Sequence, residues 1–243
     1  MPLSPPASSL VASRVDALPW PEIEAALATS GCPLTGPLFT EAECTALAAL
    51  YDQDRPFRSR VVMQRHGFGQ GEYKYFDYPL PDLLAPWREA LYARLAPLAN
   101  AWARALGLPA DYPASHADYL ARCHAAGQVR PTPLLLRYDT GDYNCLHQDL
   151  YGELQFPMQL TVLLSRPGED FSGGEFVLTE QRPRMQSRAE VVPLRQGEAV
   201  VFAVNQRPVN GTRGTYRVTM RHGVSRVRSG RRMTLGLIFH DAA

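Results

Sequence analysis

The chain has 243 residues, 45% of them apolar, and a formal net charge of +1 at pH 7. Its size allows one large domain or two small ones, and the near-neutral charge gives no global sign of a nucleic-acid or membrane partner. No apolar run approaches the roughly 18 residues that cross a bilayer, and the four cysteines lack zinc-like spacing. We therefore expect a globular, cytoplasmic protein with no membrane contact and no obligate protein partner.

The N-terminal half of the chain predicts mostly helices. Residues 1–19 are rich in Pro, Ser and Ala and lack periodicity, so we expect a flexible lead-in there. A mainly helical region is expected over residues 20–128, because capping residues, helix-initiating prolines and apolar residues at helical spacing recur in it. The expected elements are helices near residues 20–30, 41–51, 81–106 and 114–126, and a strand near residues 57–64.

Residues 65–78 bring glycines, cations and aromatic side chains together. Aromatic rings interleaved with cations are what proteins use to stack on nucleic-acid bases. The position of this segment, ahead of the β-rich half of the chain, favours a substrate lid. The alternative is a hairpin whose tyrosines pack on the core.

After Gly127 the pattern changes to short apolar runs separated by Gly, Pro and Asn. Eight short strands at this spacing indicate a double-sheet jelly roll over residues 129–243. The expected fold class is α+β, a double-stranded β-helix core with the N-terminal helical region packed on it. The strands are expected near residues 132–138, 144–149, 155–164, 174–179, 189–194, 199–204, 217–222 and 232–240.

His147 and Asp149 are the first candidate site residues. In an extended segment, residues two apart point to the same face, so an imidazole and a carboxylate lie side by side. These are two members of the 2-His-1-carboxylate triad that holds Fe(II) and leaves positions open for substrate and O₂. His222 is the candidate third ligand. An isolated His-x-Asp also occurs as a hydrogen-bonded surface pair, so the interpretation depends on that third residue.

A late basic residue extends the pattern. Arg232 follows His222 after ten residues, opens an apolar strand, and stands two residues before Thr234. A His-x-Asp pair, a distal His and such an Arg resemble the Fe(II)/2-oxoglutarate-dependent oxygenases, over roughly the C-terminal half of the chain.

Two branches of that superfamily are represented. The run Arg137–Asp149 resembles the R-Y-x-x-G-x-x-x-x-L-H-Q-D pattern of AlkB-type nucleic-acid demethylases. Gly173–Glu175, His222–Val224 and the ten-residue spacing to Arg232 instead resemble prolyl hydroxylases. The C-terminal half is further similar to a bacterial family of uncharacterised oxygenases predicted to oxidise bases in nucleic acid.

The resemblance implies a catalytic centre in which His147, Asp149 and His222 bind Fe(II). It implies 2-oxoglutarate as the cosubstrate and O₂ as the oxidant. Tyr138 matches the family's tyrosine that hydrogen-bonds the cosubstrate.

The far carboxylate of 2-oxoglutarate then needs a cation, and the planar fork of arginine matches a carboxylate. On a strand Arg232 shares its face with Thr234 and other small residues, which leave room for a cosubstrate, so we favour Arg232 over Arg231. Two positions depart from AlkB: Leu136 stands in place of a cosubstrate-binding asparagine, and Ile238 in place of a second arginine.

The substrate is expected to be a base in nucleic acid, hydroxylated or oxidatively demethylated in DNA repair or modification. Residues 205–232 hold eight arginines and no acid, so we expect Arg207–Arg228 and the aromatic residues of Phe68–Tyr78 to form the binding surface. A solvated basic face is the alternative for the arginines. Two other functions stay open, a prolyl-hydroxylase-like protein hydroxylase and a non-catalytic jelly-roll binding module.

Overall fold

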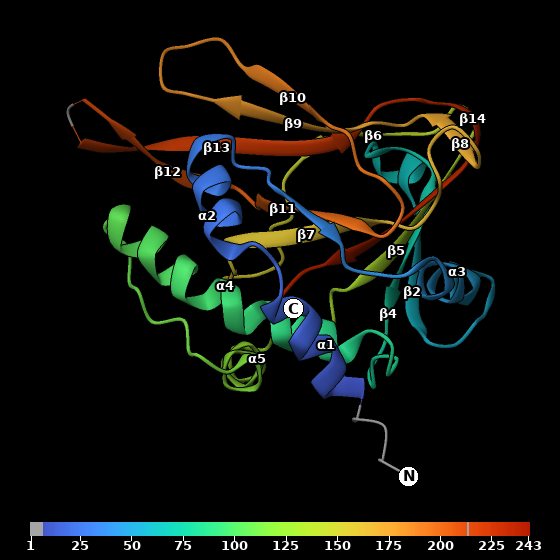
Figure 1. Ribbon diagram of the computed structural model, residues 1–243, viewed down its shortest axis with the longest axis horizontal. Coiled ribbons are helices and arrows are strands. Elements are labelled where there is room, and N and C mark those ends of the chain that lie inside the picture. Colours follow the sequence, from blue (N-terminus) through green and yellow to red (C-terminus); the bar gives the residue numbers. More distant parts are fainter. Residues whose placement is uncertain (1–6, 213) are drawn as a thin grey trace.

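The computed structural model describes residues 7–243 apart from residue 213, and two antiparallel sheets face each other in it (Figure 1). The eight-stranded sheet has the order β1 (Leu34–Pro37), β11 (Glu198–Ala203), β7 (Met158–Leu163), β14 (Val227–Leu237), β5 (Leu134–Asp139), β4 (Glu72–Phe76) and β2 (Phe57–Val62), with β8 (Phe171–Gly173) paired to β14. The six-stranded sheet has the order β10 (Arg188–Val192), β9 (Phe176–Gln181), β13 (Gly214–Val224), β6 (Tyr143–His147) and β3 (Gly69–Gln70), with β12 (Gln206–Gly211) paired to β13.

Helix α4 (Ala85–Ala105) covers the outer side of the eight-stranded sheet, whereas the end of α2 (Trp20–Thr29) contacts β12 of the six-stranded sheet. In Figure 1, α4 lies below the eight-stranded sheet, on the side away from β9, β10 and β13. The helices are α1 (Ala7–Asp16), α2 (Trp20–Thr29), α3 (Glu41–Ala49), α4 (Ala85–Ala105) and α5 (His116–Ala125), with short 3₁₀ helices η1 (Leu50–Asp52) and η2 (Met63–His66). No helix in the described part of the chain combines the length and apolar character needed to span a membrane.

Burial explains why the strands carry different sequence patterns. β7 and β11 are buried almost throughout, because the six-stranded sheet covers one face and helices cover the other. The middle of β13 alternates between buried and exposed residues. Phe176 of β9 and Phe202 of β11 meet between the sheets with ring centroids 5.1 Å apart. The α+β jelly-roll prediction is therefore confirmed.

Local signals account for several of the expected elements. Thr40 and Glu43 form a reciprocal capping box at the start of α3. The hydroxyl of Ser115 accepts a hydrogen bond from the backbone of Asp118 and begins α5. α4 continues through Pro97, where we expected a break or a kink.

The expectation of a flexible lead-in over residues 1–19 is wrong for α1. Val11 and Val15 are buried, and the guanidinium of Arg14 lies 4.7 Å from the ring of Trp87 in α4. Tertiary burial stabilises this helix although its composition resembles a linker. Residues 1–6 lie outside the described part of the chain.

Strands from both sides of residue 129, where we expected the core to begin, share one sheet. β4 pairs with β5, and Glu72 stands opposite Arg137. β3 pairs with β6 in the other sheet. The segment 65–78 is thus built into both sheets, and its role as a substrate lid stays a prediction. β4 pairs with β2 and its Tyr75 is buried, as the hairpin alternative for this segment proposed. β1, β3, β8 and β12 were not expected.

Candidate functional site

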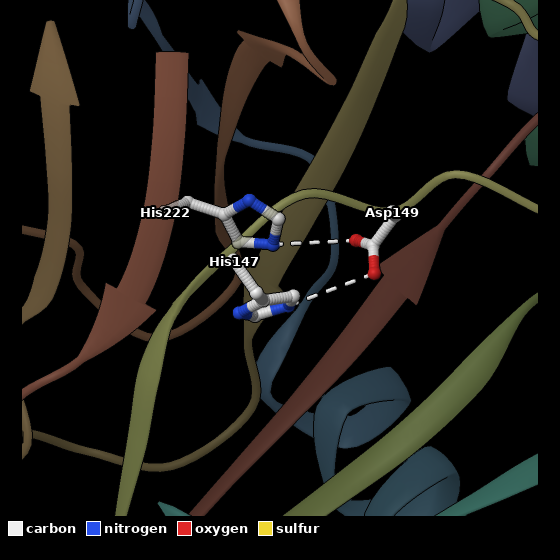
Figure 2. Close-up of side chains that lie close together, drawn as sticks. All are labelled: His147, Asp149 and His222. Carbon is white, nitrogen blue, oxygen red and sulfur yellow. Dashed lines mark ion pairs between the residues drawn. The ribbon is translucent and has the colours of Figure 1, made fainter. Parts of the chain in front are cut away.

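His147, Asp149 and His222 meet between the two sheets. β6 and β13 are neighbours, and His147 stands directly opposite His222 in their register. Asp149 follows the end of β6 and turns its carboxylate toward both rings (Figure 2). His222 Nε2 lies 3.3 Å from Asp149 Oδ2, and His147 Nε2 lies 3.6 Å from Asp149 Oδ1. The three ligand atoms all lie within 4.8 Å of one another.

The Nε2 atoms of both histidines face the carboxylate of Asp149, and Gln159 Nε2 also lies 3.4 Å from His222 Nε2. His147 Nδ1 lies 2.8 Å from the carbonyl oxygen of Cys145 and donates to it, so Nε2 carries the lone pair. The ring of His222 lies against Phe202, with centroids 4.7 Å apart, and its Nε2 also faces the carboxylate. Two imidazole nitrogens and one carboxylate that converge in this way fit an Fe(II) ion with open positions.

The environment keeps Asp149 ionised. Burial alone would raise the pKa of this carboxyl, but the hydrogen bond and charge of His222, the charge of His147 and the bond from Tyr151 hold it well below its usual range. Burial and the nearby His147 lower the pKa of His222. A neutral imidazole beside a carboxylate is the protonation state that binds a divalent metal.

A cavity of about 190 Å³ adjoins the triad. Its wall is formed by residues of both sheets, among them Phe68, Tyr73, Leu136, Tyr138, Asn144, Phe176, Val224, Arg232 and Thr234.

Arg232 lies in this wall, whereas Arg231 points outward and forms an exposed ion pair with Asp139 at 2.7 Å. Arg232 is 1% exposed, and its Nε and Nη1 have no hydrogen-bond partner among the described residues. Burial lowers the pKa of Arg232 to about 10, so it stays cationic at neutral pH. A buried cation with unpaired donors is the partner that the free carboxylate of 2-oxoglutarate requires.

Tyr138 is fully buried beside Arg232, whose guanidinium lies 5.6 Å from its ring. Its hydroxyl accepts a hydrogen bond from Asn144 Nδ2 at 3.3 Å. Burial raises the pKa of Tyr138 to about 12, so the phenol stays protonated and is able to donate a hydrogen bond.

Strict alternation along β6 would place Cys145 on the face of His147, but the structure does not place it there. Between His222 and Val224 the register shifts, and three residues of β6 span what two residues of β13 span. This extra residue turns Asn144 into the cavity and leaves Cys145 exposed. The sequence carries no local signal for such a bulge, which is why Asn144 was missed.

Two further polar residues touch Asp149 and were also missed. Tyr151 donates to Oδ1 at 2.6 Å, and Gln159 Nε2 donates to Oδ2 at 2.7 Å. Gln148 also lines the cavity, and its amide donates to Asn205 Oδ1 at 2.7 Å and to the carbonyl oxygen of Met220 at 2.9 Å.

The two histidines of α5 lie outside the site. His116 is buried and lies 2.8 Å from the carbonyl oxygen of Phe239. His124 contacts Asp241 at 2.8 Å. Neither belongs to the group of residues that converge on the cavity.

The arginine-rich segment is not a single surface. Arg207 is fully buried, pairs with Glu180, and donates to the carbonyl oxygens of Ala28 and Thr29 at the end of α2 at 2.9 and 3.0 Å. The expectation that Arg207 binds substrate is therefore wrong, because unpaired helix-terminal carbonyls and a buried carboxylate already use its donors. Arg213 lies outside the described residues.

Comparisons with known proteins identify a matching family model and similar folds. The model of the Oxygenase-NA family, described as an oxygenase catalysing oxidative methylation of damaged DNA, matches residues 71–242. An uncharacterised protein of Mycobacterium tuberculosis is 52% identical over 168 residues, which cover 69% of this chain and 72% of that protein.

Two solved structures are similar in fold. One is an oxidoreductase of the 2OG-Fe(II) oxygenase family from Burkholderia pseudomallei, with 16% identity, a TM-score of 0.55 and 92% of each chain covered. The other is a Trichoplax adhaerens prolyl hydroxylase in complex with a hypoxia inducible factor peptide fragment, with 12% identity, a TM-score of 0.53, and 96% of this chain and 93% of that chain covered. Identities this low show the fold alone.

Proposed function

The chain belongs to the Oxygenase-NA family and, with its His-Asp-His triad, is a 2-oxoglutarate/Fe(II)-dependent dioxygenase; we propose that it hydroxylates or oxidatively demethylates bases in nucleic acid. In this proposal His147, Asp149 and His222 are the metal ligands. Arg232 anchors the far carboxylate of 2-oxoglutarate, and the phenol of Tyr138 donates a hydrogen bond to it. Bound iron, 2-oxoglutarate and O₂ supply the oxidising chemistry, and the apolar cavity wall excludes water from it.

One observation within the fold carries the choice of substrate: Phe68 lines the metal cavity and is nevertheless 48% exposed. Its backbone is held by Met63 and Cys145 through hydrogen bonds of 3.2 and 2.9 Å, and its ring stacks on His66 with centroids 5.3 Å apart. A ring fixed at a cavity mouth suits a flat base, and an enzyme that oxidises a base must take it out of the stack or meet it single-stranded.

Most other aromatic residues of the segment 65–78 make structural contacts instead. Tyr75 and Phe76 are buried, and Tyr78 donates to Asp241. Only Phe68 and Tyr73 of this segment line the cavity. We therefore propose that, of the aromatic residues in this segment, these two contact the substrate base.

Exposed arginines supply the cations that phosphates require. Arg221, Arg226 and Arg228 are exposed, and Arg226 lies 5.4 Å from the ring of Tyr143. Tyr143 pairs with Gln70 of β3, which follows Phe68 in the chain by two residues. Arg226 is thus the arginine that best suits a phosphate beside a base on Phe68.

Labelled single- and double-stranded oligonucleotides titrated at several salt concentrations test this proposal, with succinate and product mass followed in parallel. Binding is expected to weaken with salt, and Arg226→Ala should reduce the log–log slope by about 0.7 to 0.9. Phe68→Ala should lose about 1 to 3 kcal/mol of single-strand affinity. Leu146→Ala, which removes another exposed apolar side chain of comparable exposure at 47%, is the matched control.

Hydroxylation of a proline-rich peptide without salt-sensitive oligonucleotide binding would contradict the nucleic-acid proposal. The dioxygenase assignment would then stand with a protein substrate.

A further inference from the structure

Gln159 is an unusual residue for its place in the fold. It lies on β7 between the buried Met158 and Leu160, and it stands opposite Phe202 of β11. The residue itself is 3% exposed. Burying an amide among apolar side chains is unfavourable unless its hydrogen bonds are made, so a reason for the amide is required.

The amide of Gln159 reaches across from the eight-stranded sheet to Asp149. Its Nε2 donates to Asp149 Oδ2 at 2.7 Å, and the orientation of the amide follows from chemistry, because an ionised carboxylate only accepts. Tyr151 donates to the other oxygen, Oδ1, at 2.6 Å. Gln159 and Tyr151 thus bond to different oxygens of the carboxylate, and Gln159 Nε2 also lies 3.4 Å from His222 Nε2.

Stability alone does not account for Gln159. Its Oε1 is buried and has no hydrogen-bond partner among residues 7–212 and 214–243. A buried amide that is only half satisfied destabilises a fold relative to an apolar side chain of the same shape. The amide adds the hydrogen bond to Asp149 Oδ2 and a contact of its Nε2 with His222 Nε2 at 3.4 Å.

We propose that Gln159 and Tyr151 are positioning residues that fix the carboxylate plane of Asp149 against the two histidines and thereby set the affinity and geometry of the metal site. The inference rests on the proposed metal role of His147, Asp149 and His222. Hydrogen-bonded neighbours of metal ligands act in this way, because a ligand that is already oriented loses less freedom when the metal binds.

Co(II) titration of the purified protein tests the inference without relying on turnover. Gln159→Met keeps the length of the side chain and removes the amide, and Tyr151→Phe removes only the hydroxyl. Each substitution is expected to raise the dissociation constant for Co(II) by about 10- to 100-fold and to shift the visible absorption of the bound ion.

Tyr75→Phe is the matched control, because the Tyr75 hydroxyl lies 3.0 Å from the Tyr151 hydroxyl and makes no hydrogen bond to Asp149. Its Co(II) affinity and spectrum are expected to match the unsubstituted protein. Thermal unfolding of the metal-free variants distinguishes a role in stabilising the fold from a role in positioning the carboxylate. Variants that unfold earlier yet bind Co(II) with unchanged affinity and spectrum would overturn the positioning role.

Tyr151→Phe keeps the test decisive if Gln159→Met does not fold. An unchanged Co(II) spectrum and affinity in Tyr151→Phe would then overturn the inference by itself. A different result would show that the proposed metal site itself is wrong. In that case His147→Ala would bind Co(II) as tightly as the unsubstituted protein.

Discussion

Arg232 and Tyr138 stand directly opposite each other where β14 pairs with β5, and both side chains line the cavity beside the triad. Opposed residues of an antiparallel pair share a face, so this register presents a cation and a phenol together. His147 and His222 form the equivalent opposed pair in the other sheet. The cavity thus lies between two cross-strand pairs, one suited to a metal and one to a carboxylate.

The first prediction concerns substitutions of the proposed metal ligands. His147→Ala or Asp149→Ala should abolish coupled turnover and weaken Mn(II) binding, because a three-ligand site loses one of its ligands. Calorimetric titration and circular dichroism check metal binding and fold. Cys145→Ala changes an exposed neighbour and should bind Mn(II) normally. A doubly substituted protein that still couples 2-oxoglutarate decarboxylation to O₂ use at the original rate would show that the ligands are wrongly assigned.

Arg232 should govern the requirement for 2-oxoglutarate. Removing one partner of a buried, hydrogen-bonded charge pair typically costs about 2 to 5 kcal/mol, so Arg232→Ala should raise the apparent KM for 2-oxoglutarate by at least tens of fold. Arg231→Ala should change it little, because Arg231 forms an exposed pair with Asp139. Steady-state assays of both variants decide, and the reverse order would refute the assignment.

The buried ion pair between Arg88 and Asp241 should contribute strongly to the stability of the fold. Arg88 Nη2 contacts Asp241 Oδ1 at 2.8 Å, and both side chains are almost fully buried. Arg88→Met leaves a buried carboxylate without its cation, which should lower the free energy of unfolding by about 3 to 5 kcal/mol.

The exposed pair of Arg94 and Asp16 has the same 2.8 Å separation, with side chains 45% and 61% exposed. Arg94→Met should therefore lower the free energy of unfolding by no more than about 1 kcal/mol. Urea unfolding of both variants provides the comparison, and equal effects would contradict the burial argument.

His116 should make stability depend on pH. Burial, which has the larger effect, and the charge of Arg88 lower the pKa of His116 to about 3 in the folded protein. The unfolded chain, with an ordinary pKa of about 6.5, binds a proton that the folded chain does not, so this contribution falls as pH drops from about 6.5 toward 3, by about 1.4 kcal/mol per unit. His116→Gln should flatten the pH dependence of urea unfolding between pH 6 and pH 4.5. An unchanged slope would exclude His116 as its source.

Local sequence patterns were sufficient to predict much of the fold and part of the candidate site. Alternation put Arg232 and Thr234 on one face of a strand, and both line the cavity. The capping box at Thr40 located the start of α3. Strand spacing after Gly127 indicated a jelly roll, and the eight strands expected there correspond to β5, β6, β7, β9, β10, β11, β13 and β14. These features depend on residues close together in the chain, so they can be predicted from the sequence alone.

Other features depend on which distant segments become neighbours. The bulge that turns Asn144 inward exists only in the pairing of β6 with β13. Gln159 acquires its contact with Asp149 from the stacking of two sheets, and Arg207 is buried because Glu180 and the end of α2 surround it. The sequence by itself determined the candidate metal ligands, the strand face of Arg232 and the fold class, because alternation and spacing are local. Only the tertiary structure decided which arginines face solvent and which polar side chains hold the carboxylate, because register and sheet packing join residues that are remote in the chain.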